Sequence, residues 1–165
     1  MQFADIIGQK EVKQQLAELL QHNRLSHALL FLGKEGSGSL SLALAFAQYV
    51  VCEKVNGKNT AIKAGPSLYG NEPETLNPKP ETQTDSCGVC SACLKAQQLV
   101  HPDIHFSYPT VTRKAGEKPI ATDFITEWRE FVKSNPYGNS FDWIELIKEK
   151  ENSQGKITAR ECDDI

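Results

Sequence analysis

The chain lacks the features that would direct it into or across a membrane. None of its apolar runs approaches the roughly 20 residues that a helix needs to span a bilayer. Its first residues, MQFADIIGQKEV, have neither the basic flank nor the apolar core of a signal peptide. The sequence therefore predicts a soluble, cytoplasmic protein with no membrane partner.

An excess of charge of one sign is also missing. The chain has 18 lysines and arginines against 21 aspartates and glutamates, which gives a net charge of -3. This balance provides no overall electrostatic attraction to nucleic acid or to an anionic membrane. No Ser–His–Asp arrangement and no pair of carboxylates rises above chance, so hydrolytic chemistry of those kinds is not indicated.

With 165 residues, 39% of them apolar, the chain can bury one core, and a single domain is expected. The first third of the chain has the pattern of an α/β unit. An amphipathic helix is predicted over 9–23, with Val12, Leu16, Leu19 and Leu20 on one face. A buried strand is predicted over 28–32, closed by Gly33, and a buried helix over 40–51.

Further along, one long insertion and several shorter elements are predicted. Residues 56–85 contain four prolines and three glycines without periodicity, which indicates a flexible surface insertion. A short helix is expected over 92–100, a second strand over 103–109, and amphipathic helices over 121–135 and 140–152. The apolar residues assigned to these last two helices are Phe124, Ile125, Trp128, Phe131 and Val132, then Phe141, Ile144 and Ile147, with Trp143 also in the core.

The last residues contain a helix-start signal. Thr158 and Glu161 have the T-x-x-E spacing of a capping box, yet only four residues follow Glu161. Since so short a piece is a marginal helix, we expect the chain to be a fragment of a longer protein. A frayed natural C-terminus is the alternative.

The glycine-rich stretch after the predicted strand has the outline of a phosphate-binding loop. Such a loop reads G-x-x-x-x-G-K-[ST], and here the glycines are Gly33 and Gly38, with Gly36 between them. Ser39 replaces the lysine that contacts the β- and γ-phosphates, and Leu40 replaces the hydroxyl that holds Mg²⁺. Lys34 lies on the far side of the turn. The sequence predicts a degenerate phosphate loop without ATPase activity; a plain connecting turn is the alternative.

Three of the five cysteines stand close together. Cys87, Cys90 and Cys93 form C-x₂-C-x₂-C, a spacing that lets thiolates converge on one ion. Cys52, at the end of the buried helix, is the predicted fourth ligand, and Cys162 is the spare candidate. Structural zinc is favoured over an iron–sulfur cluster, because no further cysteine follows in the C-x₃-C-P spacing. The alternative without a metal is a set of unligated surface thiols.

Together these segments resemble the clamp-loader subunits of bacterial DNA polymerase III. The resemblance is carried by IIGQ (residues 6–9), RLSHALLF (24–31), the loop from Gly33, and then CGVCSAC and HPDIHF. Within that family it is closest to the delta-prime type, whose loop can lack the lysine and threonine that the motor subunits keep.

The resemblance implies a P-loop NTPase-like AAA+ fold of three layers over 1–165, with a zinc module over 52–100 that contains the 56–85 insertion. It implies a non-catalytic subunit that helps to load the sliding clamp during DNA replication. The expected partners are the gamma/tau and delta subunits and, indirectly, the clamp and primer-template DNA. Two alternatives are an ATP-binding motor subunit and a free-standing zinc-binding interaction module.

Overall fold

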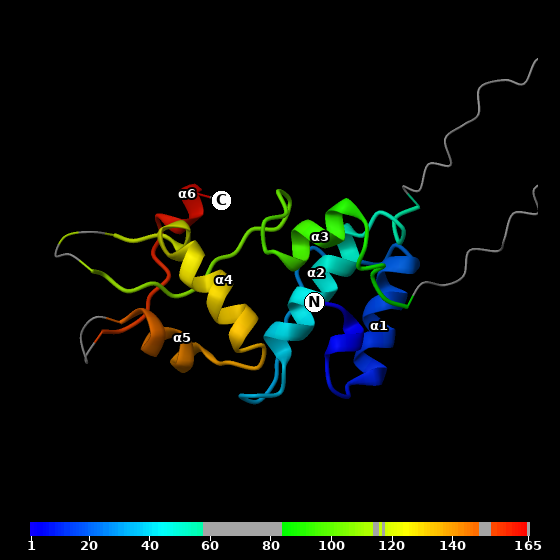
Figure 1. Ribbon diagram of the computed structural model, residues 1–165, viewed down its shortest axis with the longest axis horizontal. Coiled ribbons are helices and arrows are strands. Elements are labelled where there is room, and N and C mark those ends of the chain that lie inside the picture. Colours follow the sequence, from blue (N-terminus) through cyan, green and yellow to red (C-terminus); the bar gives the residue numbers. More distant parts are fainter. Residues whose placement is uncertain (58–83, 114–115, 117, 149–152, 165) are drawn as a thin grey trace, which may run out of the picture. The chain divides into compact units, whose positions relative to one another are not determined.

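A computed structural model describes residues 1–57, 84–113, 116, 118–148 and 153–164 of the chain. The chain forms two compact units, whose helices are labelled in Figure 1. Unit 1 comprises Met1–Leu29 and Leu44–Gln97, and unit 2 comprises Leu30–Ala43 and Gln98–Ile165. None of the helices within the described ranges combines the length and the apolar character needed for a membrane crossing.

Regular structure in the described ranges consists of helices. The predicted helices over 9–23, 40–51, 92–100 and 121–135 are confirmed, with ends that differ by a few residues. The helix predicted over 140–152 is confirmed up to Ile147, and residues 149–152 lie outside the described ranges. The elements are a 3-10 helix at Phe3–Asp5, α1 at Lys10–Gln21, α2 at Ser39–Val51, α3 at Ser91–Gln97, a 3-10 helix at Ala121–Phe124, α4 at Ile125–Ser134, α5 at Ser140–Ile147 and α6 at Glu161–Asp164. Most of the 56–85 insertion, residues 58–83, lies outside the described residues.

The core of unit 1 is built around the second half of α2. Phe46 and Tyr49 of this helix are buried, and the ring of Tyr49 lies 5.4 Å from that of Phe3. Helix α1 contributes Leu16 and Ala17, whereas Val12, which the periodicity places on the same face, stays 41% exposed. The narrow buried stripe is consistent with an amphipathic helix that rests on a small core.

The core of unit 2 is an aromatic cluster between α4 and α5, which pack against each other (Figure 1). The rings of Tyr108 and Trp128 stack with centroids 4.2 Å apart, and Trp143 meets Trp128 edge-on at 5.2 Å. Two of its polar atoms find partners: the Tyr108 hydroxyl donates to the Ala121 carbonyl and the Trp143 indole N–H to the Pro109 carbonyl. The indole N–H of Trp128 is buried without a hydrogen-bond partner among the described residues. The prediction that both tryptophans belong to a core is confirmed.

Helix α5 begins at a clear capping signal, but its buried face differs from the predicted one. The side chain of Asn139 accepts a hydrogen bond from the Asp142 N–H, and the Asp142 carboxylate accepts from the Asn139 N–H. Trp143 and Ile147, four residues apart, are buried, while Phe141 is 67% exposed. The assignment of Phe141 to the core was wrong, because the larger Trp143 takes the inward-facing position.

The burial of Ile147 allows a matched test of the α5 register. Ile147→Ala should lower the free energy of unfolding of unit 2 by about 2–5 kcal/mol, since it leaves a cavity in the core. Leu146→Ala, next in the chain but 54% exposed, should change it by less than about 0.5 kcal/mol. Denaturation followed by tryptophan fluorescence measures this, because both tryptophans lie in unit 2. Equal effects would contradict the register.

The two predicted strands are not present in the described residues. Over 28–32 the chain forms no strand, and Leu30 and Leu32 are 86% and 87% exposed. Over 103–109 none forms either, and the sole pairing in the described ranges is an antiparallel bridge between Thr110 and Lys156. An apolar run favours burial, but a strand also needs a neighbour for its N–H and C=O groups. The α/β prediction is therefore not confirmed.

The predicted capping box at the end of the chain does not form. A helix does begin nearby, at Glu161, but the hydroxyl of Thr158 is buried without a hydrogen-bond partner among the described residues. The carboxylate of Glu161 instead accepts the Ala121 N–H at 2.7 Å. The T-x-x-E spacing suits a capping box, but the Glu161 carboxylate binds the backbone of a residue 40 positions earlier in the chain.

Candidate metal centre and glycine-rich loop

Three segments of unit 1 bring four cysteines together. Cys52 directly follows α2, Cys87 and Cys90 lie in the loop before α3, and Cys93 lies in the first turn of α3. Their Sγ atoms all lie within 4.8 Å of one another, and those of Cys87 and Cys93 are 3.9 Å apart. Cys162, the spare candidate, belongs to unit 2 and is exposed.

The geometry of this cluster suits a tetrahedral metal ion. Four thiolates bound to zinc at about 2.3 Å would lie about 3.8 Å from one another. The backbone supports the sulfurs, since the N–H groups of Cys87, Cys90 and Cys93 donate to the Sγ atoms of Cys52, Cys87 and Cys90 at 3.4, 3.3 and 3.4 Å. An all-sulfur donor set is characteristic of zinc and of iron–sulfur centres. The four side chains can therefore hold a metal ion of this class.

The thiols of the cluster differ in their acidity. Burial disfavours the thiolate of Cys87, but hydrogen bonds from the N–H groups of Val89 and Cys90 outweigh it and lower the pKa of Cys87 to about 7. Burial raises the pKa of the Cys93 thiol, whose side chain is fully enclosed. A coordinating thiol is deprotonated outright, so a bound cation would hold all four as thiolates.

Local contacts fix the two ends of the cluster. Next to Cys52, the Asn56 amide donates to the carbonyls of Val50 and Cys52, which closes the end of α2. The Ser91 hydroxyl, at the start of α3, donates to the Glu53 carboxylate at 2.7 Å. The Ser91–Glu53 bond thus ties the residue that follows Cys52 to the start of α3.

The glycine-rich loop of unit 2 ends where α2 begins, at Ser39. Gly36 and Gly38 have φ angles of +72° and +79°, in the left-handed region that favours glycine. Gly38 also lies flush against Tyr137: a Cβ there would be 2.7 Å from the ring. The Ser41 hydroxyl donates to the carbonyl of Pro136, so the loop before α5 is fastened to the first turn of α2.

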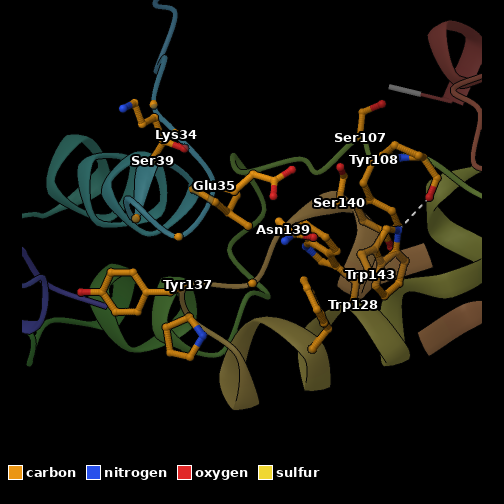
Figure 2. Close-up of a pocket in the computed structure, with 18 residues that line it drawn as sticks. Lys34, Glu35, Ser39, Ser107, Tyr108, Trp128, Tyr137, Asn139, Ser140 and Trp143 are labelled. Atoms are coloured by element: carbon orange, nitrogen blue, oxygen red, sulfur yellow. Dashed lines mark hydrogen bonds between the residues drawn. The ribbon is translucent and has the colours of Figure 1, made fainter. Parts of the chain in front are cut away.

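A cavity of about 350 Å³ lies between this loop and the aromatic core of unit 2. Figure 2 shows Tyr108, Trp128 and Trp143 grouped together in it, with Lys34 pointing away from these rings. Lys34 is the single cation among the described residues that line the cavity. The N–H groups at the start of α2 can attract an anion, but Ser39 and Leu40 supply neither the charge nor the Mg²⁺-holding hydroxyl of a complete phosphate loop.

Two contacts at these sites were missed by the reasoning from sequence. Asp85 lies two positions before Cys87 and accepts three backbone N–H groups, two of them from Phe3 and Ala4. Tyr137 packs on Gly38 across about 100 positions of sequence. Neither contact could be found from spacing, because both depend on how distant parts of the chain fold together; the closeness of Asp85 to the cysteines was the sole local signal.

Comparison with known proteins connects the first part of the chain to DNA polymerase III. The family model described as "DNA polymerase III, delta subunit" matches residues 8–67. This covers α1, the glycine-rich loop, α2 and Cys52. No solved structure matches the chain.

Individual relatives extend the same connection. The tau/gamma subunit of DNA polymerase III from Haemophilus influenzae is 46% identical over 50 residues, which is 30% of this chain and 7% of that protein. The tau subunit from Escherichia coli is 33% identical over 96 residues, 58% of this chain and 11% of that protein. The tau subunit from Bacillus subtilis is 41% identical over 51 residues, 31% and 9% of the two chains.

The chain thus spans only 7–11% of the length of these relatives. The matched part of the chain is homologous to the tau and gamma subunits of DNA polymerase III.

Proposed function

We propose that the chain is part of a non-catalytic clamp-loader subunit of DNA polymerase III, of the delta-prime type, that helps to load the sliding clamp during DNA replication. The observation that carries this proposal is the loop inside the matched segment: it keeps the glycines, but Ser39 and Leu40 stand where a motor subunit needs lysine and a hydroxyl. Its partners would be gamma/tau and delta subunits and, through them, the clamp and primer-template DNA.

The proposed fold is an AAA+-like domain over 1–165 that includes a metal module over 52–100. Homology to the tau and gamma subunits supports this assignment for the N-terminal part. A subunit of this kind needs the fold to present surfaces to its neighbours, but not the nucleotide switch. The degenerate loop is consistent with that role, because the loop can remain as a structural turn after its reactive side chains are lost.

Structural zinc is the proposed occupant of the cysteine cluster. The four-sulfur set, with Sγ atoms within 4.8 Å and two cysteines fully buried, favours a closed structural site over a catalytic one, which would keep an open position. An iron–sulfur centre is the competing chemistry. Zinc would join the end of α2 to α3, and it would take no part in a reaction.

The relatives themselves favour one alternative. Each of the three described above is a tau or gamma subunit, the type that the resemblance identifies as the ATP-binding motor. An active motor requires tight Mg·ATP binding, which Ser39 and Leu40 argue against. A free-standing zinc module is less well supported, since the family match begins at residue 8 and covers α1 and the glycine loop as well as Cys52.

Clamp loading tests the proposed role directly. The intact protein that carries this sequence should co-purify with gamma/tau and delta subunits and should raise the rate of clamp loading in a reconstituted assay. The variant Ser39→Lys, Leu40→Thr restores the loop's reactive side chains, and it should load clamps at the wild-type rate because catalysis resides in the neighbouring subunits. The role is refuted if the protein binds none of these subunits, or if loading is equally fast without it.

A further inference from the structure

The side chain of Asp85 links the first residues of the chain to the loop that bears the cysteines. Its Oδ1 atom accepts hydrogen bonds from the backbone N–H groups of Phe3 at 3.0 Å and Ser86 at 2.7 Å. Its Oδ2 atom accepts from the N–H of Ala4 at 2.9 Å. One carboxylate thus holds both the start of the Phe3–Asp5 helix and the residue that precedes Cys87.

Gln2 makes a second connection to the same loop. Its amide donates to the Ser86 carbonyl at 2.6 Å. Its side chain also covers Gly88, where an added Cβ would lie 3.0 Å from the Gln2 Oε1 atom. Gly88 has a φ of +71° and sits in the turn between Cys87 and Cys90. The N-terminal segment therefore touches the turn that sets the spacing of two candidate ligands.

Packing shows that these contacts belong to an ordered core. Phe3 and Ile6 are 3% and 4% exposed, although they lie near the start of the chain. Ser86 is 3% exposed, and its hydroxyl accepts the Gln48 amide N–H of α2 at 2.9 Å. The backbone from Asp85 to Gly88 is thus held from two sides, by residues 2–6 and by α2.

We propose that Asp85 is a positioning residue of the metal centre, and that it couples metal binding to the docking of residues 2–6. The proposal rests on the metal ion proposed above. A bound ion fixes Cys87 and Cys90 and with them the adjoining backbone. The carboxylate of Asp85, a residue of that backbone segment, is then held in place to accept the N–H groups of Phe3 and Ala4. Because such coupling is reciprocal, docking of the N-terminal segment must strengthen metal binding by the same factor.

Metal affinity measures the coupling from the side of the cysteines. Zinc is titrated into the full chain in competition with a chromogenic chelator. Asp85→Ala should weaken zinc binding by about 10–100-fold, as is typical when a residue that orients metal ligands is removed. Asp85→Asn keeps one acceptor oxygen, so its zinc affinity should lie between those of the wild-type chain and Asp85→Ala. Glu11→Gln, the loss of an exposed carboxylate on α1, should leave the affinity unchanged.

Hydrogen exchange measures the coupling from the side of the N-terminus. In the wild-type chain, the N–H groups of Phe3 and Ala4 should exchange faster once EDTA has removed the zinc. In Asp85→Ala they should exchange fast with and without zinc. Circular dichroism checks that each variant folds, and Asp85→Asn supplies the comparison if Asp85→Ala does not.

The outcomes separate this inference from the proposal on which it rests. If the wild-type chain binds no zinc, the metal centre itself is wrong and the coupling falls with it. If the wild-type chain binds zinc but the Asp85 variants bind it equally well, the coupling alone is overturned. It is also overturned if chelation leaves exchange at Phe3 and Ala4 unchanged.

Discussion

Replacing Cys93 by serine is expected to abolish metal binding and to unfold α3 together with the loop before it. Cys93 is fully buried, and a neutral serine hydroxyl there supplies neither the charge nor the soft sulfur that zinc prefers. Structural zinc contributes about 10–16 kcal/mol of apparent binding free energy in zinc-finger peptides, much of it expressed as folding. This range is as large as the roughly 5–15 kcal/mol of net free energy that keeps a typical domain folded. Loss of the zinc should therefore dominate the stability of unit 1.

Elemental analysis of protein purified without added metal should give one zinc per wild-type chain and none for Cys93→Ser, with a loss of helical circular dichroism. Cys162→Ser is the matched control: this thiol is exposed and lies in unit 2, so zinc and helicity should be retained. Tryptophan fluorescence reports on unit 2 alone and separates local from global unfolding. Iron with visible absorbance, or zinc retained by Cys93→Ser, would contradict the assignment.

Helices could be predicted from this sequence because their signals are local. Trp128, Phe131 and Val132 in α4 reveal the buried face through spacings of one to four residues, and in α1 the predicted face was right for Leu16 although Ala17 was missed. Strands could not, because their stability depends on a neighbour that the segment itself does not specify. The apolar run over 28–32 shows a preference for burial, but Leu30 and Leu32 find no strand partner in the described ranges.

The candidate metal centre also has a part that local sequence predicts and a part that it does not. Cys87, Cys90 and Cys93 are joined by two-residue spacings, so their convergence follows from the local sequence. Cys52 is separated from Cys87 by 34 intervening residues, and it reaches the cluster because α2 ends beside α3, where the Ser91 hydroxyl donates to the Glu53 carboxylate. The contacts of Asp85 could not be assigned from its closeness to the cysteines, since its partners Phe3 and Ala4 lie more than 80 residues earlier.

Mg·ATP is expected to bind this chain weakly, and no hydrolysis is expected. Position 39 stands at the first residue of α2, where a lysine would meet the phosphates, and Lys34 points away from the cavity's rings (Figure 2). The missing lysine and hydroxyl would each have made a charge-assisted contact worth about 1.5–3 kcal/mol. At 1.4 kcal/mol per decade, both losses together should weaken binding by roughly two to four decades relative to a complete loop.

Calorimetric titration with Mg·ATP and an assay of phosphate release measure these two expectations. Ser39→Lys, Leu40→Thr is the matched variant and should bind Mg·ATP more tightly than the wild-type chain, because it regains both contacts on the same loop. Its clamp-loading rate should nevertheless stay at the wild-type value, since the gain serves no step that the proposed role requires. Micromolar Mg·ATP affinity of the wild-type chain would instead favour the motor-subunit alternative, because Ser39 and Leu40 would then not disable the loop.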